Sequence, residues 1–157
     1  MLRSISLVEI EEMIYQARKL SRKHIIMRLH EYHEPVQRTV HAMIPGTYIT
    51  PHKHENPDKV ELFCILKGRI AVLEFSGRGE IQNIVTLEDR GAVRIIDIPP
   101  RTYHTVIPLE PCAVLEIIQG PYDPENHLIP ATWAPLEDTP KAPDYLMYLT
   151  SIVHNWR

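Results

Sequence analysis

The sequence predicts an all-β fold, a sandwich or closed barrel of short strands, with a helix near each end of the chain. From residue 25 onward the apolar residues follow a period of two, which is typical of strands with one buried face. Turn signals such as Pro45-Gly46 and Lys67-Gly68 separate these runs at short intervals. The 157 residues include 14 prolines. That number suits many short strands joined by tight connections and does not suit a helical bundle.

The first predicted element is a helix over residues 6–23. Ser6 can cap this helix, and Glu9 three positions later completes a capping box. Apolar side chains recur at helical spacing through Leu7, Ile10 and Ile14, and positive charge gathers toward the C-terminal end. We expect one face of the helix to pack against the β-structure.

A series of strands is predicted after this helix. They cover residues 25–30, 36–44, 46–54, 60–66, 69–75, 81–87, 93–98, 104–108 and 112–119. Strands of this length and spacing are typical of a sandwich or closed barrel. A chain of 157 residues has the size of one domain with one core.

Residues 120–143, beyond the last strand, are irregular and rich in proline. A connection this long in a compact domain is either a functional lid or a packed tail. In one interpretation Tyr122 and Trp133 fold over the mouth of the barrel as a lid. In the other, Trp133 anchors the tail to the barrel wall. Residues 144–156 predict a short amphipathic helix. The single domain therefore divides into an N-terminal helix (residues 1–24), a barrel (25–120) and a tail with the C-terminal helix (121–157).

Composition excludes several classes of protein. The net charge is -3 and the sequence contains no Lys/Arg block, so a nucleic-acid partner is not expected. The first dozen residues include acidic side chains and no uninterrupted apolar run, which argues against a signal peptide or membrane span and favours a cytoplasmic protein. Cys64 and Cys112 lie in apolar strands without CxxC spacing, and we interpret them as buried thiols.

Three histidines and a glutamate form a candidate metal site. His52 and His54 are two residues apart, so both project from the same face of a predicted strand. Glu61 opens the next strand and His104 follows a proline-rich turn. Each of these residues alone is more commonly a surface or packing residue, but the strand assignments place them on adjoining strands. Such an N3O donor set suits one divalent transition-metal ion, namely Fe, Mn, Ni, Zn or Co.

The spacing of these residues resembles that of the cupin superfamily. The first cupin motif is matched by Gly46, His52, His54, Glu61 and Gly68, and the second by Gly91, Pro99 and His104. Over residues 28–137 the chain looks more narrowly like the WbuC-type cupin metalloproteins, with PVQRTVHAMIPGTYITPHKH, ELFCILKGRIAVLEF and LEIIQGPYDPENH as the stretches that carry the likeness. This resemblance implies a double-stranded β-helix, or jelly-roll barrel, and a link to polysaccharide biosynthesis. Arg101 and Pro108 depart from the second motif.

Alternate residues of each strand line the interior of a small barrel, so residues predicted to face the same side as the metal ligands are candidate substrate contacts. They are Gln37, Tyr48, Glu116, Arg28, His30 and, on the tail, Trp133. For each of them a structural role is the alternative interpretation. The partner that this interior predicts is a small molecule. A homodimer is a further expectation, because small barrels with exposed edge strands often pair.

Three functions fit these residues. The first is a metal-dependent enzyme acting on a small polar or sugar-type molecule, as an isomerase or lyase, or as an oxygenase if the metal is iron. The second is a non-catalytic binding or sensing module. The third is a metal-free sugar-nucleotide isomerase or epimerase in which His104 serves as base and Tyr48 as acid. The sequence assigns no catalytic residue among these alternatives, and the fold class does not choose between them.

Overall fold

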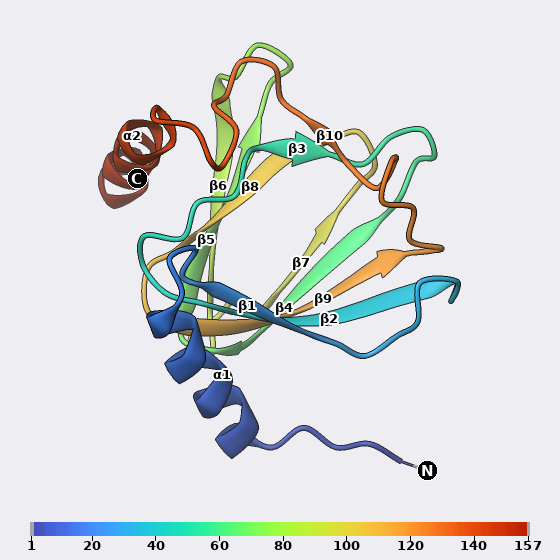
Figure 1. Ribbon diagram of the computed structural model, residues 1–157. Coiled ribbons are helices and arrows are strands. Elements are labelled where there is room, and N and C mark those ends of the chain that lie inside the picture. Colours follow the sequence, from blue (N-terminus) through green and yellow to red (C-terminus); the bar gives the residue numbers. More distant parts are fainter. Residues whose placement is uncertain (1, 157) are drawn as a thin grey trace.

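Two five-stranded antiparallel sheets face each other in the computed structural model, which describes residues 2–156 (Figure 1). The strand order is β1-β2-β9-β4-β7 in one sheet and β10-β3-β8-β5-β6 in the other. The elements are α1 (Leu7–Lys19), β1 (His24–Arg28), β2 (Val36–Met43), β3 (His52–Lys53), β4 (Glu61–Lys67), β5 (Arg69–Phe75), β6 (Ile81–Glu88), β7 (Ile95–Ile98), β8 (Tyr103–Pro108), β9 (Cys112–Gln119), β10 (Ile129–Pro130) and α2 (Ala142–Asn155). The predicted all-β fold with a helix near each end is confirmed.

Alternation along the strands builds the core between the sheets. In β4, Glu61, Phe63 and Ile65 are all buried, so the face that holds the apolar core also carries the glutamate. Ile70 and Val72 of β5 meet this core from the opposite sheet. The predicted parity of β4 therefore places the Glu61 carboxylate inside the barrel.

The helices cover the outer faces of the two sheets. Helix α1 begins at the Ser6–Glu9 capping box and packs Ile10, Met13 and Ile14 against the sheet that contains β2 and β9. Helix α2 packs on the other sheet through Leu149, which is 1% exposed. Neither helix of the described chain is long and apolar enough to span a bilayer.

One predicted strand is largely absent. Residues 46–51 are irregular and only His52–Lys53 form β3, although residues 46–54 were predicted as a strand. Pro51 has no N–H to donate to a ladder, and the Thr47 hydroxyl donates to the carbonyl oxygens of Lys23 and Ile44. The structure also adds β10, which pairs with β3 and ties the tail to the barrel.

Candidate metal centre

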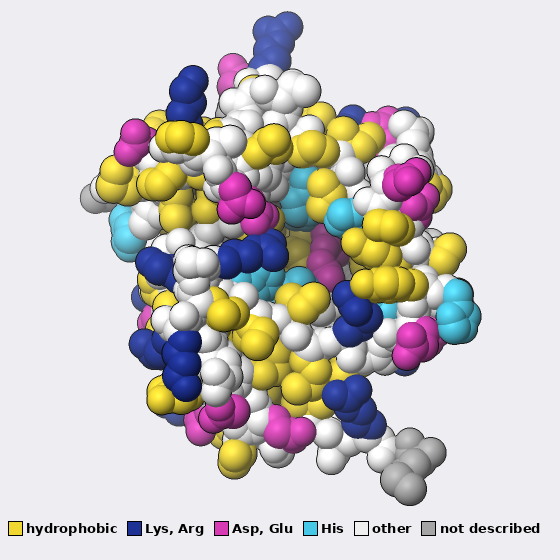
Figure 2. Space-filling view, in the orientation of Figure 1, with side chains coloured by type: hydrophobic (Ala, Val, Ile, Leu, Met, Phe, Trp, Pro, Cys, Tyr) yellow, Lys and Arg dark blue, Asp and Glu magenta, His cyan; other side chains and the backbone are white. Residues whose placement is uncertain are grey.

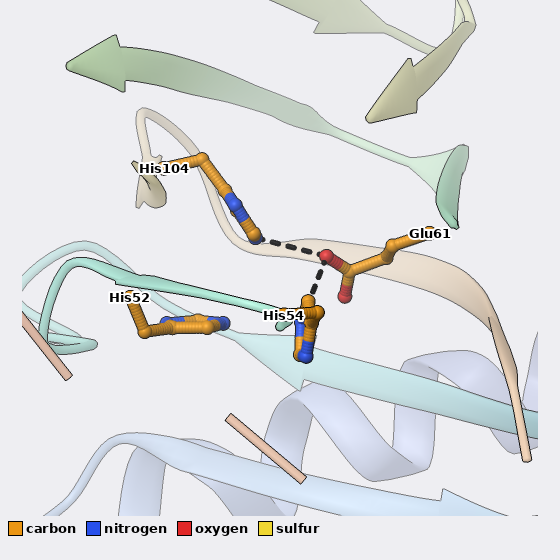
Figure 3. A group of neighbouring side chains, drawn as sticks. All are labelled: His52, His54, Glu61 and His104. Carbon is orange, nitrogen blue, oxygen red and sulfur yellow. Dashed lines mark ion pairs between the residues drawn. The ribbon is translucent and has the colours of Figure 1, made fainter. Parts of the chain in front are cut away.

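The four predicted ligands converge inside the barrel (Figure 3). His52 of β3 lies directly opposite His104 of β8 in the strand register, and Glu61 opens β4 across the barrel. Each of the four residues offers one ligand atom, and these four atoms all lie within 4.8 Å of one another. His54, Glu61 and His104 are at most 5% exposed, and His52 is partly exposed. We call these four residues the quartet.

Backbone carbonyls fix the tautomer of each histidine in the quartet. The Nδ1 atoms of His52 and His104 lie 2.9 and 3.0 Å from the carbonyl oxygens two residues earlier, those of Thr50 and Thr102. His54 Nδ1 lies 2.6 Å from the carbonyl oxygen of His127 in the tail. Because a carbonyl oxygen only accepts, each Nδ1 carries the proton. In the neutral imidazoles the lone pair is then on Nε2.

The atoms that face the centre of the quartet are left without hydrogen bonds. His54 Nε2, His104 Nε2 and Glu61 Oε2 are buried and have no hydrogen-bond partner in the described part of the chain. Glu61 Oε2 lies 2.9 Å from His104 Nε2 and 3.3 Å from His54 Nε2, contacts drawn as dashes in Figure 3. Imidazole Nε2 atoms and a carboxylate gathered this closely are satisfied by a shared proton or by a metal cation bound between them. The N3O donor set fits a divalent transition metal.

The charges of the quartet also suit a metal. Burial, then the nearby His104, lowers the pKa of His52 to about 3, so its imidazole is neutral and ready to coordinate. Burial alone would raise the pKa of Glu61, but the close approach of His104 and His54 outweighs it and holds that pKa well below its usual range. Burial opposes charge on His104, yet Glu61 raises its pKa. Glu61 thus favours a proton on His104, and a divalent ion held by the quartet would release that proton on binding.

A cavity of about 330 Å³ opens onto the quartet. In Figure 2 histidine and carboxylate side chains lie inside a hollow of the surface, with Lys and Arg side chains on its rim. Three predicted substrate contacts line the cavity, namely Gln37, His30 and Glu116. Its volume is at the small end of the range for small-molecule sites.

A match to a family model shows the family of this chain. A family model described as "Domain of unknown function (DUF6016)" matches residues 5–87, more than half of the 157 residues. The chain belongs to this family. No curated protein matches the chain.

Solved structures identify the fold of this DUF6016 member as a cupin. An uncharacterized conserved protein with a double-stranded β-helix domain from Klebsiella pneumoniae gives a TM-score of 0.59 at 16% identity, over 83% of this chain and 98% of that chain. An RmlC-like cupin protein from Desulfovibrio desulfuricans gives a TM-score of 0.53 at 18% identity, over 76% of this chain and 97% of that chain. A cupin superfamily protein from Desulfitobacterium hafniense gives a TM-score of 0.50 at 14% identity, over 61% of this chain and 76% of that chain. At such identities the likeness shows the fold alone.

Three predicted substrate contacts lie outside the cavity of this DUF6016 cupin. Tyr48 is turned away from it, and its hydroxyl donates to the Pro135 carbonyl at 2.6 Å. The parity that grouped Tyr48 with His52 fails because residues 46–51 are not a regular strand. The assignment of Tyr48 as an acid opposite His104 loses its geometric basis for the same reason.

Arg28 and Trp133 also lie outside the cavity. Arg28 is exposed, and its guanidinium lies 4.4 Å from the ring centre of Tyr32. Trp133 packs 5.0 Å from Phe75 between ring centres, on the outer face of the second sheet, so it anchors the tail. Tyr122 does line the cavity, and it stacks on Tyr32.

Several residues that line the cavity were not predicted from the sequence, and His24 and Lys59 are two of them. His24 opens β1, and its Nε2 lies 2.9 Å from Nδ1 of His41, whose Nε2 lies 3.0 Å from Glu116 Oε2. Lys59 lies two residues before Glu61 but outside β4, so strand facing does not predict its position. The histidine chain depends on the register between β1, β2 and β9.

The folded protein is expected to lose stability in acid through His24. Burial, and then the neighbouring His41 and Arg22, lowers the pKa of His24 from 6.5 to about 3. Because the folded pKa is the lower one, this contribution is complete above pH 6.5 and is lost as the pH falls from 6.5 toward 3. The loss is about 1.4 kcal/mol per pH unit at most. Urea unfolding between about pH 7 and about pH 4.5 should give a steeper decline for the wild type than for His24→Leu, and equal declines would contradict this assignment.

Proposed function

We propose that this cupin binds one divalent transition-metal ion at the quartet and acts as an isomerase or lyase on a small polar molecule held in the adjoining cavity. The observation that carries the proposal is the orientation of the histidines. Their Nδ1 atoms are held by backbone carbonyls, while the Nε2 atoms of His54 and His104 are buried without partners beside Glu61. Most buried polar atoms in a structural core are hydrogen-bonded to their surroundings, whereas these atoms face only one another.

The chain's own residues supply the rest of the chemistry. A bound divalent ion would act as a Lewis acid toward a carbonyl or hydroxyl oxygen of the substrate. Glu116 and His41 form a pair in the cavity wall with 3.0 Å between Oε2 and Nε2, and this pair can hold a proton and exchange it with the substrate. Apolar side chains such as Phe63 and Val114 line the same cavity and exclude water from it.

We place the substrate among sugars and sugar derivatives. The support is the resemblance of residues 28–137 to the WbuC-type cupins, whose link is to polysaccharide biosynthesis, together with a cavity of about 330 Å³ whose lining includes Gln37, His30 and Glu116. An oxygenase would need a redox-active metal, whereas the proton-holding pair favours proton transfer.

Turnover by a variant of the pair tests the proposal. The metal-loaded protein is incubated with a panel of sugars, sugar acids and keto acids, and products are followed by proton NMR. We expect conversion of at least one compound, and Glu116→Gln should lower its kcat by about 10²–10⁴-fold with metal content unchanged. The control Glu110→Gln removes a carboxylate that pairs with Arg69 on the surface, and it should keep full activity. Compounds that raise the melting temperature without forming product would make the protein a binding module instead.

A further inference from the structure

Lys59 brings a buried positive charge to the cavity beside the quartet. It lies two residues before Glu61, lines the cavity and is only 5% exposed. Its ammonium group has three protons to donate, and one goes to the carbonyl oxygen of Pro121 at 3.1 Å. No second hydrogen bond from the Lys59 ammonium forms within residues 2–156, so its other donors can meet a ligand.

No acidic residue within residues 2–156 forms an ion pair with Lys59. The other cation that lines the cavity, Arg22, is paired with Glu137 at 3.0 Å. Asp123 lies near enough for Lys59 to help lower the pKa of its carboxyl, after the hydrogen bonds from Glu125 and Asn126, but the two make no ion pair. An ammonium group that is only 5% exposed is costly without a close counter-charge. The cavity thus has a place for one negative charge next to Lys59.

Gln37 supplies an acceptor in the same cavity. Its Nε2 donates to the carbonyl oxygens of Glu34, at 2.7 Å, and Tyr32, at 3.3 Å, and this fixes which end of the amide is the oxygen. Gln37 is 3% exposed, and its Oε1 is buried with no hydrogen-bond partner. A buried acceptor of this kind is matched by a donor such as a ligand hydroxyl.

We infer that the ligand of this cavity is a small hydroxylated carboxylic acid, a sugar acid or a related hydroxy acid, whose carboxylate binds Lys59 and one of whose hydroxyls donates to Gln37. This inference rests on the proposed function, because it takes the cavity beside the quartet as the substrate site. A carboxylate carries one charge and matches one ammonium. A phosphate carries nearly two charges and would have to sit in a cavity that Glu61 and Glu116 also line.

Three ligands that differ only at one carbon test the inference. D-Glucuronate, D-glucose and D-glucose 6-phosphate share their ring hydroxyls and differ in carrying a carboxylate, a hydroxymethyl or a phosphate group. Their affinities are measured by titration calorimetry on metal-loaded and metal-stripped protein. We expect glucuronate to bind at least tenfold more tightly than glucose, and more tightly than the phosphate, in both forms.

The variants assign that preference to Lys59. Lys59→Met should bring the ratio of the glucuronate and glucose affinities close to one, and Lys59→Arg should keep most of it. Lys67→Met is the matched control, because Lys67 lies at the other end of β4, outside the cavity, and pairs with Glu11. A cooperative thermal transition for each variant shows that it folds. Gln37→Met should weaken both sugars alike.

Two results would overturn the inference. In one, none of the three ligands binds; in the other, the glucuronate preference survives in Lys59→Met and disappears when the metal is removed. The second result would leave the metal site intact, because the metal itself would then select the carboxylate. Conversely, a Lys59-dependent preference in a protein that binds no metal supports the inference and contradicts the proposed function.

Discussion

Loading the quartet with a divalent metal ion is expected to raise the thermal unfolding midpoint by roughly 8–16 °C. A ligand that binds only the folded state at about 1,000 times its Kd stabilises it by about 4 kcal/mol. For a chain of this size each kcal/mol corresponds to about 2–4 °C. The unfolded chain presents no preformed set of three imidazoles and a carboxylate, so the binding free energy becomes folding free energy.

Calorimetric scans of metal-stripped protein, titrated with Zn(II), Ni(II) and Mn(II) in turn, measure this shift. His52→Ala/His54→Ala removes two of the four ligands and should show no more than a small part of the shift, because the remaining Glu61 and His104 cannot complete a coordination set. A shift of equal size in the double variant would assign the stabilisation to metal bound elsewhere.

Gly68→Ala is expected to destabilise the fold by about 2–4 kcal/mol. Gly68 turns the chain between β4 and β5 with a φ of 76°, a conformation that L side chains rarely adopt. A Cβ atom there would lie 2.3 Å from the carbonyl oxygen of Pro111 and 3.0 Å from Cα of Cys112. Both neighbours are backbone atoms at the start of β9, so the clash cannot be relieved by a side-chain rotation.

Gly77→Ala is the matched control for this substitution. Nothing lies within 4 Å of a Cβ atom at position 77, so the change should stay within about 0.5 kcal/mol of the wild type. Urea unfolding of the three proteins gives the comparison. A Gly68→Ala protein as stable as Gly77→Ala would show that the β4–β5 turn relaxes without cost.

The quartet could be predicted because its geometry depends mainly on local facing. His52 and His54 are two residues apart, and Glu61 shares the alternation of an apolar strand, so parity suggested that these side chains face inward. The match to the cupin motif spacing then joined them with His104. Tyr48 was misplaced by the same rule, because Pro51 and the Thr47 hydrogen bonds interrupt the strand that the rule assumes. Parity holds only while the ladder is continuous.

Features that depend on contacts between distant segments were not accessible from the sequence. The His24–His41–Glu116 chain requires the register of three strands, and the carbonyl that orients His54 comes from His127 in a tail with no periodic pattern. That no acidic residue of the described chain forms an ion pair with Lys59 likewise becomes visible only once the whole cavity wall is assembled.

Elemental analysis of the purified protein, expressed with ample metal, tests the central claim most directly. It is made beside His52→Ala/His54→Ala and beside His33→Ala/His154→Ala, which removes two exposed histidines outside the quartet. We expect close to one transition-metal ion per chain in the wild type and in the surface variant, and none in the quartet variant. Equal metal content in all three proteins, or no metal in any of them, would contradict a metal site at His52, His54, Glu61 and His104.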